Sequence, residues 1–136
     1  MGAAVSPDRE LQARAGACLS SYGIDVRVDA DGSLGFEYEG ALSSLRAVNL
    51  APGLDVLSLT CVLAWDRPLK AQLHKRVAER NNALQFGSLT VIARGGQADV
   101  ILRYTFPGAG LDDQALTTML LLVLSNASRA RQGLLP

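Results

Sequence analysis

The chain has 136 residues, 49% of them hydrophobic and 19% charged, and its 13 basic residues balance its 13 acidic ones. A chain of this size buries roughly two thirds of its unfolded surface on folding, which is enough for one domain with its own core. The balanced charge gives no overall field that would draw the protein to nucleic acid or anionic lipid. We therefore expect a single domain over residues 1–136, with flexible ends at 1–5 and 132–136.

The cysteines and the apolar segments exclude further classes of protein. Cys18 and Cys61 lie far apart and lack the spacing of a zinc site or a redox motif, so we interpret both as buried free thiols. The N-terminus has no basic region followed by an apolar run, and the longest apolar block, Met119–Leu124, is far below the roughly 18 residues of a membrane span. The sequence predicts a cytoplasmic protein with no cofactor and no membrane insertion.

The first predicted helix begins at Ser6-Pro7, which suit an N-cap and a first-turn proline, and ends near Tyr22. Its apolar residues recur every three or four positions and form one narrow stripe. Two short strands follow, separated by turn residues at 29–32. In the second strand, apolar residues at 34, 36 and 38 alternate with small or acidic ones.

The paired acids Glu37 and Glu39 invite a catalytic interpretation, because glycosidases use two carboxylates. Residues two apart on a strand share a face, however, so we interpret these acids as the exposed side opposite Phe36 and Tyr38. The acids in the 29–32 turn likewise lack the twelve-residue pattern of a calcium loop. No catalytic or metal-binding residue is predicted here.

The longest predicted strand runs from Leu54 to Ala64, after a weaker candidate at Leu45–Leu50. One of its faces is fully apolar, through alternate residues from 57 to 63. The other face carries no charge, although a strand exposed to solvent usually does, which indicates covering by a neighbour, a partner chain or an extended peptide. We predict a partner or dimer surface at Val56, Ser58, Thr60 and Val62.

We expect a second helix capped by Asp66, with Pro68 in its first turn and an inner stripe at Leu69, Leu73 and Val77. The lone histidine, His74, has no partner for a metal site or a catalytic triad. The basic residues could contact nucleic acid, but no aromatic residues are interleaved with them for base stacking. We predict an acid-binding face at Lys70, Lys75, Arg76 and Arg80.

Residues Phe86–Phe106 predict a β-hairpin, because two β-branched runs flank Gly95-Gly96. This glycine pair is not a phosphate-binding loop, since such a loop leads from a strand into a helix. The row Val100, Leu102 and Tyr104 is expected to seat the final helix. Asp112 should cap that helix, whose apolar surface is so wide that either the sheet wraps around it or another chain helps to cover it. We predict a second partner or dimer surface at Leu121, Leu122 and Leu124.

The expected order is helix, three strands, helix, two-strand hairpin, helix, which favours an α+β fold with a largely antiparallel sheet and helices on one face. This order, with the segment HKRVAERNNALQFGSLTVIARGGQADVILRYTF and the terminal helix LDDQALTTMLLLVLSNASRA, resembles the YbjN-like proteins and the type III secretion chaperones. The resemblance implies a non-enzymatic homodimer that binds a segment of another, unidentified protein. Secretion chaperones are usually acidic, whereas this chain is neutral, so the YbjN-like group fits better.

Two other functions remain open. One is a ligand-binding or enzymatic domain, with a cavity lined by Tyr22, Tyr38, Trp65 and Tyr104. The other is a nucleic-acid-associated regulator that uses the basic face of the second helix.

Overall fold

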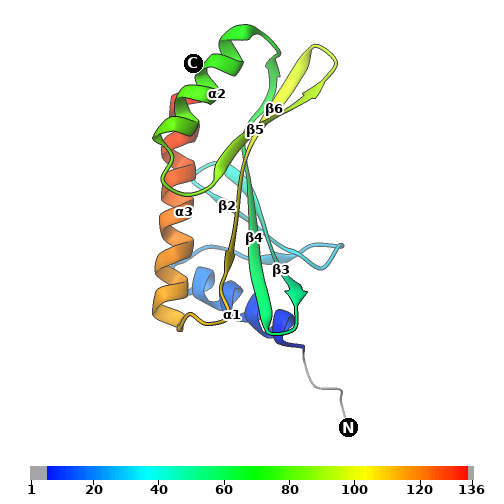
Figure 1. Ribbon diagram of the computed structural model, residues 1–136, viewed down its shortest axis with the longest axis vertical. Coiled ribbons are helices and arrows are strands. Elements are labelled where there is room, and N and C mark those ends of the chain that lie inside the picture. The colour runs from blue at the N-terminus through cyan, green and yellow to red at the C-terminus, as the bar shows by residue number, and fades with distance from the viewer. Residues whose placement is uncertain (1–5, 135–136) are drawn as a thin grey trace.

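The fold is a single twisted sheet with its helices on one side (Figure 1). The structure is a computed structural model that describes residues 6–134. Within that range the chain has the predicted α+β arrangement. Its elements are α1 (Pro7–Ser21), β1 (Arg27–Val28), β2 (Leu34–Tyr38), β3 (Ala41–Ala51), β4 (Leu54–Pro68), α2 (Ala71–Ala83), β5 (Ser88–Arg94), β6 (Gln97–Pro107) and α3 (Asp113–Leu134).

All neighbouring strands run antiparallel, in the order β1-β2-β3-β4-β6-β5. The predicted order of helix, strands, helix, hairpin and helix is confirmed. Within residues 6–134, four strands precede α2, because the weak candidate at 45–50 is part of an 11-residue strand. Pairing with β2 on one side and β4 on the other stabilises this strand beyond its local propensity.

The core fills the space between the sheet and the helices. α3 runs along the molecule, with α1 packed at one end of it and α2 at the other (Figure 1). The predicted apolar row of β4 is confirmed, since Leu57, Leu59, Cys61 and Leu63 are at most 1% exposed. Burial of such side chains contributes roughly 1.5–3 kcal/mol each to stability. The helices supply the rest of the core through residues that include Leu11, Leu19, Leu73, Val77, Leu116, Leu120 and Val123.

The predicted start of α2 is wrong. β4 continues through Asp66 to Pro68, and α2 begins at Ala71. Asp66 accepts a hydrogen bond from Arg94 Nη2 at 2.7 Å, and its own N–H donates to Asp99 Oδ1 at 3.0 Å. Asp66 therefore bonds to the hairpin and does not cap a helix. Its side chain is engaged by Arg94 and its backbone N–H by Asp99.

The predicted hairpin is confirmed. β5 and β6 are joined by Gly95-Gly96, and Gly95 has a φ of +63°, which favours glycine. Tyr104 stacks on Phe106, with 5.6 Å between ring centroids. The helix that lies against β5 is α2, whereas α3 packs chiefly against β4. That the row Val100, Leu102 and Tyr104 seats the final helix stays a prediction; Val100 and Leu102 are fully buried in the core that α3 helps to form.

The ends of the helices follow the predicted signals. α1 has its proline in the first turn and ends before Tyr22. At the start of α3, Asp112 Oδ1 accepts a hydrogen bond from the Ala115 N–H at 2.8 Å. Residues 132–134 lie in the last turn of α3. The predicted flexibility of residues 1–5 and of 135–136 lies outside the described residues.

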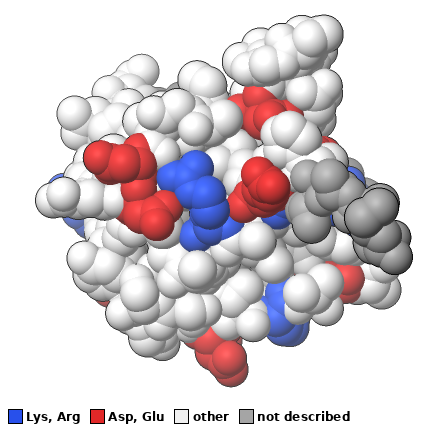
Figure 2. Space-filling model, turned by 90° about the horizontal axis from the view of Figure 1, so that it is seen from below, with Lys and Arg blue, Asp and Glu red and all other residues white. Residues whose placement is uncertain are grey.

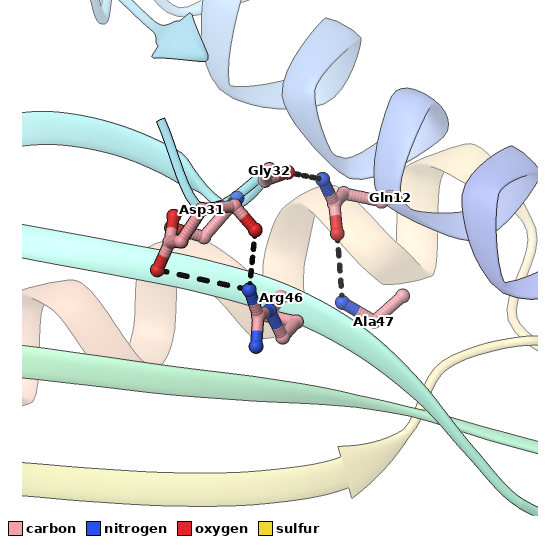
Figure 3. A network of polar contacts seen from close by, with 6 residues as sticks. Gln12, Asp31, Gly32, Arg46 and Ala47 are labelled. Atoms are coloured by element: carbon pink, nitrogen blue, oxygen red, sulfur yellow. Dashed lines mark hydrogen bonds and ion pairs between the residues drawn. The ribbon is translucent and has the colours of Figure 1, made fainter. Parts of the chain in front are cut away.

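A polar network fastens α1 to the β1–β2 turn and to β3 (Figure 3). Gln12 Nε2 donates to the Gly32 carbonyl at 2.8 Å, and the Ala47 N–H donates to Gln12 Oε1 at 3.0 Å. Arg46 Nη2 donates to the Asp31 carbonyl at 2.6 Å. These hydrogen bonds hold α1 and the β1–β2 turn in place against β3.

Candidate functional site

The predicted surface on the long strand lies on the side of the sheet that no helix within residues 6–134 covers (Figure 1). Strand pairing brings residues of β3 and β6 beside those of β4 on this side: Val62 lies between Leu42 and Ile101, and Thr60 between Ser44 and Arg103. We call the centre of this side the open face, formed by Leu42, Ser44, Ser58, Thr60, Val62 and Ile101.

The open face is uncharged and only partly accessible. Leu42 is 42% exposed, whereas Ile101 is buried and Val62 is half-buried between them. Val56, predicted as a surface residue, is 5% exposed and offers little contact area. Its register partners are Val48 on β3 and Pro107 on β6. The sequence analysis missed Leu42 and Ile101, because their place beside Val62 depends on the register of strands far apart in the chain.

Charged side chains form a rim around this neutral centre. Arg46 lies beside Ser58 on β3, and Arg103 lies beside Thr60 on β6. At the β1 side, the ion pair between Arg27 Nε and Asp29 Oδ1, 3.0 Å apart, lies across Gly35. A Cβ at Gly35 would lie 2.8 Å from Arg27 Nη2, so glycine gives this pair its place on the sheet. A neutral centre with a charged rim is typical of protein interfaces.

The second predicted surface, on α3, has to be corrected in part. Leu124 is 1% exposed and belongs to the core, because it follows Leu120 by one helical turn on the stripe that faces the sheet. Leu121 is half-buried and Leu122 is 45% exposed. Leu122 borders an apolar groove of about 470 Å³, which is lined by Leu111, Asp112, Gln114, Ala115, Thr118, Met119 and Leu122.

The predicted acid-binding residues of α2 are all exposed, but they do not form one patch. Lys70 and Arg76 line a small cleft with Arg67, whose buried Nε has no hydrogen-bond partner. Arg80 lines a different cleft, of about 310 Å³, together with Arg129 of α3. Only tertiary packing brings Arg129 of α3 beside Arg80, so their proximity could not be predicted from the sequence.

Both predicted free thiols are buried. Desolvation raises the pKa of the Cys61 thiol to about 11, partly opposed by a hydrogen bond from Ser43. Cys18 Sγ lies 3.7 Å from the Asp113 carbonyl, at the junction of α1 and α3. Both thiols are shielded from solvent, and the raised pKa of Cys61 also keeps that thiol protonated and poorly nucleophilic.

The remaining candidates for chemistry do not come together in one site within residues 6–134. Glu37 is exposed on β2, as predicted, but Glu39 lies in the β2–β3 turn with a φ of +47° and accepts a hydrogen bond from Ser128 Oγ. Tyr22 and Trp65 are more than half exposed, so they do not close a cavity with the half-buried Tyr38 and Tyr104. Within residues 6–134, no three His, Cys, Asp or Glu side chains are grouped as metal ligands would be.

Charge elsewhere on the surface is mixed. The end of the molecule that carries α1 shows acidic and basic side chains interspersed among uncharged ones (Figure 2). Arg14 of α1 forms an ion pair with Asp113 at 3.0 Å and donates to the Leu111 carbonyl at 2.6 Å. None of the described helices is both long enough and apolar enough to span a bilayer.

Comparison with known proteins decides the family. Residues 17–136, from the middle of α1 to the end of the chain, match the YbjN family, whose description is "Putative bacterial sensory transduction regulator". The chain belongs to the YbjN family. A search of curated proteins gave no match.

Solved structures agree on the fold of this YbjN-family protein. One similar structure is described as "Crystal structure of YbjN, a putative transcription regulator from E. coli". It superposes with a TM-score of 0.62 over 86% of this chain and 88% of that chain, at 8% sequence identity. At so low an identity, the likeness shows a common fold, while function has to be argued from the surfaces of this chain.

Proposed function

We propose that this YbjN-family protein is a non-enzymatic regulatory adaptor of the cytoplasm, which acts as a homodimer and binds a segment of another protein. The observation that carries the proposal is the open face. It is an uncharged strip across three strands, on the side without helices and with a charged rim. Because isolated neutral strand faces are poorly suited to solvent, a polypeptide partner is the natural cover.

The chemistry of the open face favours an extended or helical peptide with small apolar side chains. Val62 and Leu42 supply apolar contact, and Ser44 and Thr60 supply hydroxyl groups for hydrogen bonds. The groove beside Leu122 is a second apolar surface that such a partner could contact on the helix side. The shifted pKa values of Asp31, Arg94 and Asp99 arise from hydrogen bonds and ion pairs at turns and strand ends, outside the open face.

The test compares partner capture by the wild-type protein and by Val62→Glu, with Ser20→Glu as the matched control. Both variants add one carboxylate, the first on the open face and the second at an exposed position of α1. We expect light scattering to report a dimer, and Val62→Glu to lose protein partners that Ser20→Glu retains, with unchanged far-UV circular dichroism. Identical partner sets for both variants, or a monomer at micromolar concentration, would contradict the proposal.

A second candidate function is nucleic-acid association through α2, favoured by the two clefts that gather Arg67, Arg76, Arg80 and Arg129. This function predicts binding that weakens steeply as salt increases. Reversing the charge of Lys75, Arg76 and Arg80 together should abolish it. Binding that persists in that triple variant would exclude this use of α2.

A further inference from the structure

The two edges of the sheet are built differently. β1, at one edge, has two residues, and short edge strands limit pairing with other chains. β5, at the other edge, has seven residues of sequence SLTVIAR, with no proline and no lysine. A strand of this length presents unpaired backbone groups that can pair with another strand.

The side chain of Asn81 shows which backbone groups of β5 point outward. Asn81 Oδ1 accepts from the Leu89 N–H at 2.7 Å, and Asn81 Nδ2 donates to the Leu89 carbonyl at 3.1 Å. This amide thus occupies the place of one residue of a neighbouring strand. Because outward-pointing residues alternate along an antiparallel strand, Val91 and Ala93 also direct their N–H and C=O groups away from β6. Within residues 6–134, these groups have no hydrogen-bond partner.

We propose that β5 pairs antiparallel with β5 of a second copy of this chain, about a twofold axis through Ile92. This inference rests on the homodimer of the proposed function and names its interface. In this register Val91 faces Ala93 of the partner subunit, and Ala93 faces Val91 of the partner subunit. The backbone groups left free in each subunit are thereby satisfied by those of the other, as the self-complementary interface of a twofold dimer requires.

The side chains of β5 fit the same register. Ile92, 38% exposed on the side of the open face, meets Ile92 of the partner subunit, so the dimer covers an exposed apolar residue. Arg94 meets Thr90 of the partner subunit and not another arginine. Its charge is already paired with Asp66 at 2.7 Å and Asp99 at 2.8 Å, so no unpaired cation enters the interface.

The ends of the strand also allow this pairing. The paired segment would run from Thr90 to Arg94 in each subunit, because the Asn81 amide already occupies the edge at Leu89 and β5 ends at Arg94, before the Gly95-Gly96 turn. On α2, the exposed His74 and Ala78 precede Asn81 by seven and three residues and lie on the same side of the helix. This side of α2 would add contact area beside the strands. The dimer would form one continuous sheet with both open faces on the same side, available to a partner.

Cysteine cross-linking tests the register. Ile92 and its counterpart would form a pair without hydrogen bonds between them, with Cα atoms about 4.5 Å apart, within the range for a disulfide. Thr90 and its counterpart would be four residues out of register, about 14 Å apart along the strands at ~3.4 Å per residue. We would oxidise Ile92→Cys and Thr90→Cys and analyse both by non-reducing electrophoresis. The native Cys18 and Cys61 are buried and do not compete.

We expect a wild-type dimer by light scattering, a covalent dimer of Ile92→Cys that reverts on reduction, and no covalent dimer of Thr90→Cys. If the wild type is a dimer but Ile92→Cys does not cross-link, the β5 interface is wrong while the homodimer stands. Equal cross-linking of both variants would overturn the register, since it indicates random collision. A monomeric wild type would overturn both this interface and the homodimer.

Discussion

The two sides of β4 differ sharply although their residues alternate along one strand. Leu57, Leu59 and Cys61 face the helices and are fully buried, while Ser58 and Thr60, between them in sequence, lie half-buried on the open face. Both rows are uncharged. The inner row is apolar because α1 and α3 pack on it, and the outer row is neutral although no described helix does. Packing against the helices explains why the inner row is uncharged, whereas the uncharged outer row calls for a functional explanation.

The largest effect is expected on the inner row. Leu59→Ala removes a fully buried side chain from the middle of the core and leaves a cavity between β4 and the helices. We expect the free energy of unfolding to fall by about 3 kcal/mol, measured by urea denaturation. A loss below about 1 kcal/mol would show that the helices collapse onto the sheet and that this side is less tightly packed than the structure indicates.

The buried thiol gives the inner row a dependence on pH. The pKa of Cys61 is raised by burial to about 11 from an unfolded value near 9, so the unfolded chain releases this proton first as pH rises. Between these values, stability should fall by up to about 1.4 kcal/mol per pH unit through this group, and below pH 9 the contribution is constant. Cys61→Ala should lack this decline when compared with the wild type from pH 8 to 11; parallel curves would exclude the predicted titration.

A smaller effect is expected on the solvent side of α3. Leu122 is 45% exposed, so Leu122→Ala should reduce the free energy of unfolding by about 1 kcal/mol. Leu124→Ala is the matched control, two residues along the same helix but buried, and it should cost about 3 kcal/mol. Equal losses in chemical denaturation would show that the two positions are packed alike.

The smallest effect is expected on the open face itself. Thr60→Ala removes a half-buried side chain from the outer row and should change the free energy of unfolding by no more than about 0.5 kcal/mol. The same variant should weaken partner capture if its hydroxyl contributes to binding. A loss of stability as large as that of Leu59→Ala would mean that the outer row is a second core and not a surface.

The sequence predicted the elements whose signals are local. Gly95-Gly96 gave the hairpin, Pro7 and Asp112 gave the starts of two helices, and the alternation along β4 assigned its inner row correctly. Each of these signals depends on the backbone geometry of adjacent residues, or on a period of two, and needs no knowledge of the remaining chain.

The sequence-based predictions were wrong where contacts with residues far away in the chain override the local signals. Asp66 and Pro68 have the composition of a helix start, but pairing with Asp99 and Gln97 draws them into β4. Leu124 was predicted as surface together with Leu122, although only the packing of α3 on the sheet decides which side of a nearly continuous apolar helix is buried. The candidate site was found on β4 alone, without its neighbours on β3 and β6.

The sequence by itself determined an α+β fold with a neutral outer row on its longest strand, because periodicity and turn chemistry act over a few residues. Only the tertiary structure decided that Leu42 and Ile101 flank Val62, and that Asn81 occupies the β5 edge at Leu89 while Val91 and Ala93 stay free. The physical reason is that strand register and side-chain capping join residues far apart in the chain. Their geometry exists only once the helices have packed against the sheet.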